Sequence, residues 1–145
     1  MPLLIKVPWM TRGGSACGVP VISHDWFPTI LELAGADRSS SRTALDGISF
    51  VSLLEGRASL PRQELFWHYP HYWNGTKVSP YSVARVGDWK LIRFYESDRE
   101  ELYNLSDDLS EERDLASTLP DRRHALSVRL DAWLKEVGAQ MPVAR

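Results

Sequence analysis

The chain has 145 residues, of which 43% are hydrophobic and 25% charged, and this ordinary globular composition excludes a disordered tail or a collagen-like fibre. Its 17 Lys and Arg against 19 Asp and Glu leave a net charge of −2, which argues against a nucleic-acid binder because that class normally carries a basic excess. No run of about 18 apolar residues is present, so no membrane span is predicted.

The chain opens with an apolar run at 2–7 that is typical of a buried strand. A buried strand needs neighbours on both sides, and we therefore expect further sequence before Met1. Glycine, serine and proline follow over 11–20, which predicts a loop.

A helix is predicted next, because apolar residues recur at helical spacing between Trp26 and Ala34. Ser23 or Asp25 is the expected cap at its start. Gly35 suits the left-handed position after the last turn.

The middle of the chain predicts an antiparallel meander of three strands or more. Short apolar or aromatic runs, each bounded by turn residues, lie at 65–69, 82–86, 89–95 and 101–105. The second and third flank the dipeptide Gly87-Asp88, which is a hairpin signal.

A C-terminal helix is predicted from Pro120, which is tolerated in a first turn, to Gly138. Its apolar stripe is Leu126, Leu130, Trp133, Leu134 and Val137. We expect this helix to pack on one face of the meander. The predicted fold class is therefore α+β: a small antiparallel sheet of three or four strands with a C-terminal helix, plus an N-terminal strand-loop-helix from a larger, truncated α/β domain.

Aromatic residues gather in the predicted sheet, where nine of the fifteen lie between Phe66 and Tyr95. Composition alone favours a ring-packed core over a carbohydrate-facing surface. His68 and His71 lie in this region. Two histidines are too few for a metal site, and two roles are about equally supported: rings satisfied within the aromatic cluster, or contacts to a substrate.

Two further patterns carry little chemistry. Ser23-His24-Asp25 contains the residue types of a hydrolase triad, but adjacent side chains diverge, so a helix cap is favoured. The acidic stretch lacks the ligand alternation and central glycine of a calcium-binding loop, and it is interpreted as a solvated loop and cap; its members are Asp107, Asp108, Glu111 and Glu112.

Six short stretches, taken in order, resemble the C-terminal part of the formylglycine-dependent sulfatases of the alkaline phosphatase superfamily. These stretches lie at 2–8, 21–35, 45–49, 53–56, 85–92 and 101–105. The second contains Asp-x-x-Pro-Thr and the third reads Leu-Asp-Gly-Ile-Ser. The resemblance covers nearly the whole chain, and its strength lies in the order of the stretches.

The resemblance implies hydrolysis of a sulfate ester, often on a carbohydrate, with calcium holding the sulfate and formylglycine attacking sulfur. Formylglycine is made from the first residue of Cys/Ser-x-Pro/Ala-x-Arg. Cys17 is followed by Gly-Val-Pro-Val and does not fit that motif. The family's early Asp pair and its Asp-Asn/His-Gly segment are also absent. Calcium and formylglycine are therefore expected in the full-length parent, upstream of Met1, and no catalytic or metal-binding residue is assigned in this chain.

The resulting prediction is the C-terminal segment of a sulfatase, inactive alone, in which 1–60 ends the truncated catalytic α/β domain and 61–145 forms the C-terminal subdomain. It would brace the main domain and wall the cleft for a sulfated small molecule or carbohydrate. His68 and His71 are the candidate substrate contacts.

Other functions stay open at this point. The chain could be a stand-alone module that binds sulfated glycans through 66–73, or a non-functional fragment that folds poorly because its apolar N-terminal residues lack partners. A phosphate or phosphonate ester hydrolase of the same superfamily is a further alternative. Bacterial sulfatases are commonly exported, so the parent is expected in the periplasm or outside the cell.

Overall fold

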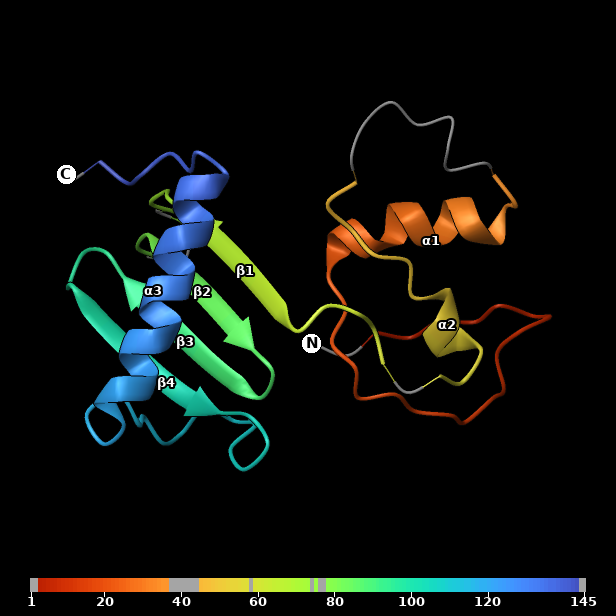
Figure 1. Cartoon of the computed structure of the whole chain (residues 1–145), viewed down its shortest axis with the longest axis horizontal. Coiled ribbons are helices and arrows are strands. Elements are labelled where there is room, and N and C mark those ends of the chain that lie inside the picture. The colour runs from red at the N-terminus through yellow and green to blue at the C-terminus, as the bar shows by residue number, and fades with distance from the viewer. Residues whose placement is uncertain (1–2, 37–44, 58, 74, 76–77, 144–145) are drawn as a thin grey trace. The chain divides into compact units, whose positions relative to one another are not determined.

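The chain forms two compact units, Met1–Arg62 and Gln63–Arg145 (Figure 1). The computed structural model describes residues 3–36, 45–57, 59–73, 75 and 78–143. None of the helices among these residues combines the length and the apolar character that a membrane crossing needs.

The first unit contains the predicted helix. A 3-10 turn, η1 (Ser23–Asp25), leads directly into α1 (Trp26–Leu33), and a short helix, α2 (Val51–Leu54), follows after a connecting segment. Gly35 has a φ of 65°, the left-handed conformation that stops α1 at little cost. The helical spacing and the glycine stop are therefore confirmed.

The predicted strand at 2–7 is wrong over the part that the structure describes. Residues 3–7 have no strand conformation, and Leu4 is 94% exposed. A turn follows instead, in which the Val7 N–H donates to Thr11 Oγ1 at 3.0 Å and the Thr11 N–H donates to the Val7 carbonyl at 2.9 Å. A strand is stabilised by its ladder partners, and no described segment of this chain pairs with residues 3–7.

The second unit is built on a four-stranded antiparallel sheet with strand order β1-β2-β3-β4. Its strands are β1 (Glu64–Tyr69), β2 (Tyr81–Val86), β3 (Trp89–Phe94) and β4 (Arg99–Asn104). β2 and β3 form a hairpin whose turn contains Gly87 with a φ of 58°. The predicted meander and hairpin are confirmed.

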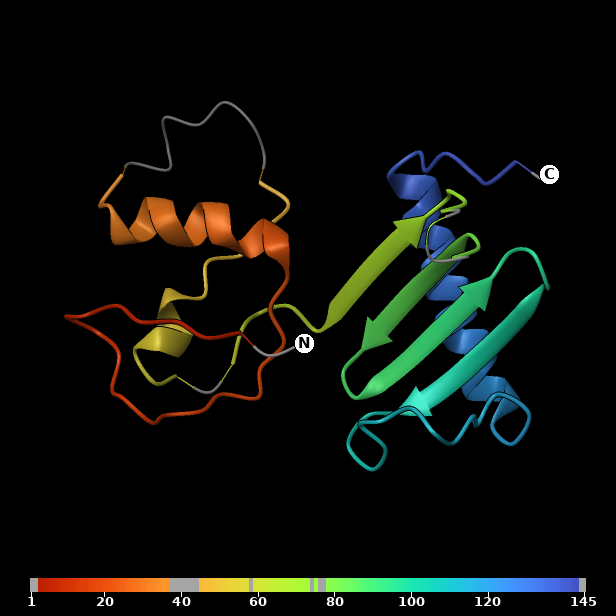
Figure 2. The same ribbon diagram turned by 180° about the vertical axis from the view of Figure 1, so that it is seen from behind.

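The long helix α3 (Pro120–Glu136) lies across one face of this sheet (Figures 1 and 2). We call the other face the uncovered face because no helix of this unit lies on it, although three of its residues, Leu65, Val83 and Tyr103, are buried. Beneath α3, apolar side chains form one buried cluster, and its members are Ala84, Leu91, Leu102, Ala116, Leu126, Leu130 and Leu134. Trp133 packs against this cluster and stacks on Phe66, with 5.1 Å between ring centroids. Val137, predicted in the stripe, is 53% exposed and lies one residue beyond the end of α3.

Polar contacts also tie α3 to the sheet. Arg93 of β3 donates to Glu100 Oε1 of β4 at 2.9 Å, and its guanidinium also reaches Asp131 and Ser127 of α3. The Arg93 side chain is only 16% exposed, and three partners from two elements fix it. This cluster orients α3 on the sheet and satisfies the buried charge.

Candidate functional site

The two candidate histidines lie on different sides of the sheet. His68 shares the α3-covered face with Phe66, two residues before it on β1. His71 follows the end of β1, and its ring meets that of Tyr69, which alternation along β1 places on the uncovered face. The sequence spacing of three residues therefore does not bring the two imidazoles to one site.

His68 is half-buried and uses both ring nitrogens. Its Nε2 lies 2.9 Å from the Gln140 carbonyl oxygen, which only accepts, so Nε2 carries a proton. In the neutral ring Nδ1 accepts from the Ser82 hydroxyl at 2.7 Å. Ser82 is fully buried and in turn accepts from the Tyr95 hydroxyl at 2.8 Å. This chain of bonds ties the segment after α3 to the sheet.

His71 is exposed and packs edge-on against Tyr69, with 5.9 Å between ring centroids. The ring of Tyr69 in turn packs against that of Tyr81 of β2, with 5.6 Å between ring centroids. His71 is therefore the candidate whose ring faces solvent, at one end of an aromatic cluster.

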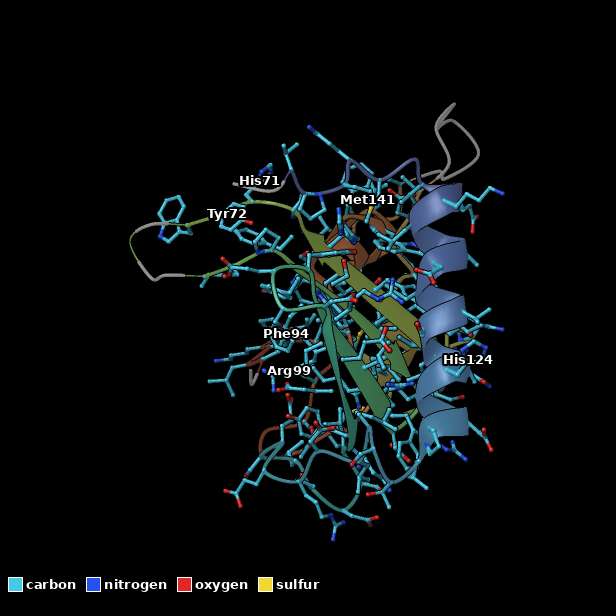
Figure 3. The ribbon with its side chains drawn as sticks, turned by 90° about the vertical axis from the view of Figure 1, so that its left-hand side faces the viewer. His71, Tyr72, Phe94, Arg99, His124 and Met141 are labelled. Carbon is cyan, nitrogen blue, oxygen red and sulfur yellow. The ribbon has the colours of Figure 1, made fainter. Side chains whose placement is uncertain are left out.

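That cluster continues across the whole sheet. The strand register pairs Tyr69 with Tyr81, Tyr81 with Phe94, and Phe94 with Arg99. We call these four residues the cross-strand row. The Arg99 guanidinium lies over the Phe94 ring, 4.9 Å from its centroid. Figure 3 shows Phe94, Arg99 and His71 on the side of the sheet away from α3.

The uncovered face of the strands is positively charged in a chain whose net charge is −2. Alternation along the four strands places three cations, Arg85, Lys90 and Arg99, on this face together with the carboxylate of Glu101. Glu111, from the loop after β4, neutralises Lys90, with 2.6 Å between Glu111 Oε2 and Lys90 Nζ. The remaining excess of positive charge suits an anionic ligand.

The cross-strand row was not predicted from the sequence, although the hairpin gives a signal for part of it. The hairpin around Gly87-Asp88 predicts that Tyr81 lies opposite Phe94, because the pairing of a two-residue hairpin is set by its turn. Extending that register to the outer strands needs the lengths of the other two turns. The residue composition of those two turns does not determine how many residues each contains.

In the first unit, Asp25 is fully buried and acts as a hub. Its carboxylate accepts from the backbone N–H groups of Ile22 and Ile48, each at 2.9 Å, and from both terminal nitrogens of Arg62, each at 2.7 Å. Burial acts to raise the pKa of Asp25, but Arg62 and the two N–H groups outweigh it, and the pKa lies below its ordinary value.

The predicted cap is therefore only partly right. Asp25 caps η1, the turn that leads into α1, by accepting the Ile22 N–H, but neither Ser23 nor Asp25 makes a side-chain cap on α1 itself. Asp25 instead joins three segments that are far apart in the sequence. The triad was correctly set aside, because every oxygen of the Asp25 carboxylate is committed to Arg62 and the backbone.

The two sulfatase-like motifs of this unit meet at the same place. Thr29 Oγ1 donates to the Asp25 carbonyl at 2.6 Å and accepts from the Phe50 N–H at 3.1 Å. A Cβ at Gly47 would come within 2.0 Å of the His24 carbonyl oxygen, so only glycine fits there. The Asp, Thr and Gly of these motifs thus have structural roles, which explains their spacing.

The described residues do not fit the sulfatase cofactors. Among them, no group of three or more His, Cys, Asp or Glu side chains is placed to hold a metal ion. Asp108 caps a turn by accepting the N–H groups of Glu112 and Arg113, and Glu111 binds Lys90 through both oxygens. The acidic stretch is thus a capped loop, as predicted for Asp108. Cys17 is exposed and lacks the formylglycine motif.

Comparison with known proteins identifies the family. Residues 1–139 match the family described as N-sulphoglucosamine sulphohydrolase, C-terminal. A sulfatase of Formosa agariphila is 34% identical over 92% of this chain and 27% of its own length. An N-acetylglucosamine-6-O-sulfatase of Bacteroides thetaiotaomicron is 31% identical over 74% of this chain and 20% of its own.

A solved structure gives a second comparison, based on the fold. A protein solved in complex with its substrate D-glucosamine-2-N,6-O-disulfate superposes with a TM-score of 0.65 and 26% identity, over 81% of this chain and 24% of that protein. This chain spans about a quarter of the length of these proteins. It belongs to the C-terminal family of the sulphoglucosamine sulphohydrolases and is a sulfatase C-terminal domain.

Proposed function

We propose that this chain is the C-terminal part of a sulfatase that hydrolyses sulfate esters of a sulfated carbohydrate, and that it is inactive by itself. The family match carries this proposal. Two relatives support it: one is named as an N-acetylglucosamine-6-O-sulfatase, and another was solved with a glucosamine disulfate as its substrate. The calcium ion and the formylglycine nucleophile would belong to the other three quarters of such a protein, since the residues described here do not fit them.

The first unit would brace the catalytic domain. We place the end of that domain at 1–60 and the C-terminal subdomain at 61–145. Exposed apolar side chains support the bracing role: Leu4 is 94% exposed, Trp9 76%, and Phe27 57%. Exposed apolar side chains in such number mark a surface that another part of the protein covers. The rest of the sulfatase polypeptide is the proposed cover.

The second unit would help to wall the substrate cleft. His71 supports this role because it is exposed beside Tyr69, where an imidazole could donate to a sulfate or a sugar hydroxyl. For His68 to contact substrate, its Nε2 must first release the Gln140 carbonyl. We therefore propose His71 as a direct contact, and His68 as a contact that is made only when the segment after α3 moves.

The test is to compare this chain with the longest protein encoded in the same frame. We expect the longer protein to carry Cys/Ser-x-Pro/Ala-x-Arg and an early Asp pair, and to release inorganic sulfate from a 6-O-sulfated glucosamine when the motif is converted. The 145-residue chain alone should release none. Sulfate release by the short chain would disprove its dependence on the missing part, and a longer protein without the motif would disprove the sulfatase assignment.

The histidine roles are tested in that longer protein by substitution. His71→Ala should raise the Michaelis constant about tenfold with little change in thermal stability, because it removes a hydrogen bond to a charged group and leaves no buried group unpaired. His68→Ala should lower stability as well, since it leaves Ser82 without its imidazole partner. An unchanged Michaelis constant in either variant removes that residue from the substrate site.

A further inference from the structure

We propose that the cross-strand row, Tyr69, Tyr81, Phe94 and Arg99, is a binding surface for the sulfated glycan chain, with sugar rings over Tyr69 and Tyr81 and a sulfate on Arg99, whose guanidinium already covers the Phe94 ring. The class of ligand rests on the proposed function. The position of the surface rests on the register of the sheet alone.

The shape of the row suits an extended chain of sugar rings. Its four side chains come from the four strands, so it crosses the sheet from one outer strand to the other over about 14 Å. The three aromatic residues are half-buried, so each keeps part of its surface open to solvent. A flat apolar strip with polar groups at both ends is the arrangement that amphipathic rings such as sugars require.

Arg99 supplies the charge at one end of the row. Its side chain is 58% exposed, and its guanidinium is held over Phe94. The ion pair with Glu101 uses Nη1 at 2.6 Å, and a guanidinium has five N–H donors, so donors remain for a second anion. An arginine that is already oriented by a ring loses less freedom when it binds an oxyanion.

His71 supplies a polar group at the other end, through its contact with Tyr69. The strand positions of the uncovered face carry three cations against one carboxylate, and Glu111 neutralises Lys90, which leaves an excess of one positive charge. On the α3-covered face, by contrast, Glu64, Arg93 and Glu100 leave a net negative charge. The positive charge thus lies on the same side as the open aromatic rings.

A second arginine offers a matched control. Arg122, near the start of α3, also lies over an aromatic ring, with its guanidinium 4.3 Å from the centroid of Trp89. Arg122 is exposed like Arg99, but Trp89 packs against the core beneath α3. Removing either arginine takes away one positive charge and one cation–π contact. Only Arg99 belongs to the cross-strand row.

The experiment is calorimetric titration of the 145-residue chain with a heparin-derived tetrasaccharide and with its desulfated form. We expect saturable binding of the sulfated form, weakened about tenfold by Arg99→Gln and by less than twofold by Arg122→Gln. Tyr69→Leu keeps an apolar side chain but removes the ring, and it should weaken binding of both forms about threefold. Circular dichroism and a thermal melt check that each variant folds.

Three outcomes would overturn the inference: no saturable binding, equal losses in Arg99→Gln and Arg122→Gln, or no loss in Tyr69→Leu. Equal losses would indicate attraction by net charge alone. If the longer protein still releases sulfate while the row binds nothing, only this inference fails. If the row binds glycan while the longer protein has no sulfatase activity, the proposed function fails and the binding surface stands.

Discussion

The two units of this chain are stabilised by different means. Among the described residues, the second unit holds ten of the thirteen buried hydrophobic residues, most of them in one cluster between the sheet and α3. The first unit has three, Val7, Phe50 and Val51, and its other buried groups include the polar side chains of Asp25 and Thr29. The second unit is stabilised by an apolar core, whereas the first depends on a hydrogen-bonded hub.

The balance of buried and exposed apolar residues also differs: among the described residues, the second unit buries ten hydrophobic residues and leaves eight large ones exposed, whereas the first buries three and leaves six exposed. The second unit buries its large apolar stripe beneath α3. The first leaves Leu4, Trp9, Phe27 and Ile30 exposed, although these residues are as apolar as those of the core. The polar groups of this unit are paired at the Asp25 carboxylate, but its large apolar side chains stay in water. Such a unit is suited to packing against a larger body. Breaking the hub and breaking the core should therefore have separate effects.

The largest expected effect comes from removing the partner of Asp25. Arg62→Gln leaves a fully buried carboxylate without its guanidinium and should destabilise the first unit by about 3–5 kcal/mol. Arg57→Gln is the control, because its pair with Glu55 is exposed and should contribute less than about 1 kcal/mol. Hydrogen exchange resolved by peptide would show faster exchange in the first unit alone. Equal exchange in both variants would contradict the hub.

A core substitution should have the next largest effect, confined to the second unit. Leu130 is fully buried, and Leu130→Ala should cost about 3 kcal/mol through lost burial and a cavity. Phe27→Ala removes a larger side chain that is 57% exposed, and in this chain it should change stability by less than about 0.5 kcal/mol. Denaturant unfolding measures both changes, together with hydrogen exchange of α3 peptides for Leu130→Ala and of α1 peptides for Phe27→Ala. A comparable loss in Phe27→Ala would show that the first unit already covers this ring.

The smallest effect is the response of the hub to acid. The pKa of Asp25 is lower in the folded chain than in the unfolded chain, so folding favours the carboxylate and its stabilisation is complete above the unfolded pKa, about 3.9. Below that value the unfolded state binds the extra proton, and the stabilisation is lost progressively as the pH falls through the lower folded pKa.

Peptides of the first unit should therefore exchange faster at pH 3 than at pH 5, relative to the intrinsic rates at each pH. Arg62→Gln should reduce this difference, because it removes the main partner that lowers the Asp25 pKa. If Arg62→Gln shows the same acid response as the unaltered chain, carboxylates other than Asp25 are responsible.

Elements that depend only on residues close together in the sequence were predicted well. The helix before Gly35, the hairpin at Gly87 and the stripe of α3 each depend on residues within a few positions of one another, and each is confirmed except for Val137 in the stripe, which is exposed. The strand at 2–7 failed because its apolar run meets the local requirement for a strand, but no described segment supplies the ladder partner that a strand also needs.

The candidate site shows the same limit. Residue type and spacing were enough to single out His68 and His71, but they could not separate the two roles. Alternation along β1 directs His68 to the α3-covered face, where Ser82 and Gln140 take both ring nitrogens. His71 lies beyond the strand, where alternation no longer applies, and its ring turns to Tyr69 on the uncovered face.

The sequence by itself determined the family, the α+β class and the order of the elements in the second unit, because these follow from short motifs and from periods of two and 3.6 residues. Only the tertiary structure decided that Asp25 binds Arg62, 37 residues away, and that Tyr69, Tyr81, Phe94 and Arg99 form one row. Contacts between distant residues depend on strand register and on the path of the connecting segments, and neither leaves a periodic signal along the chain.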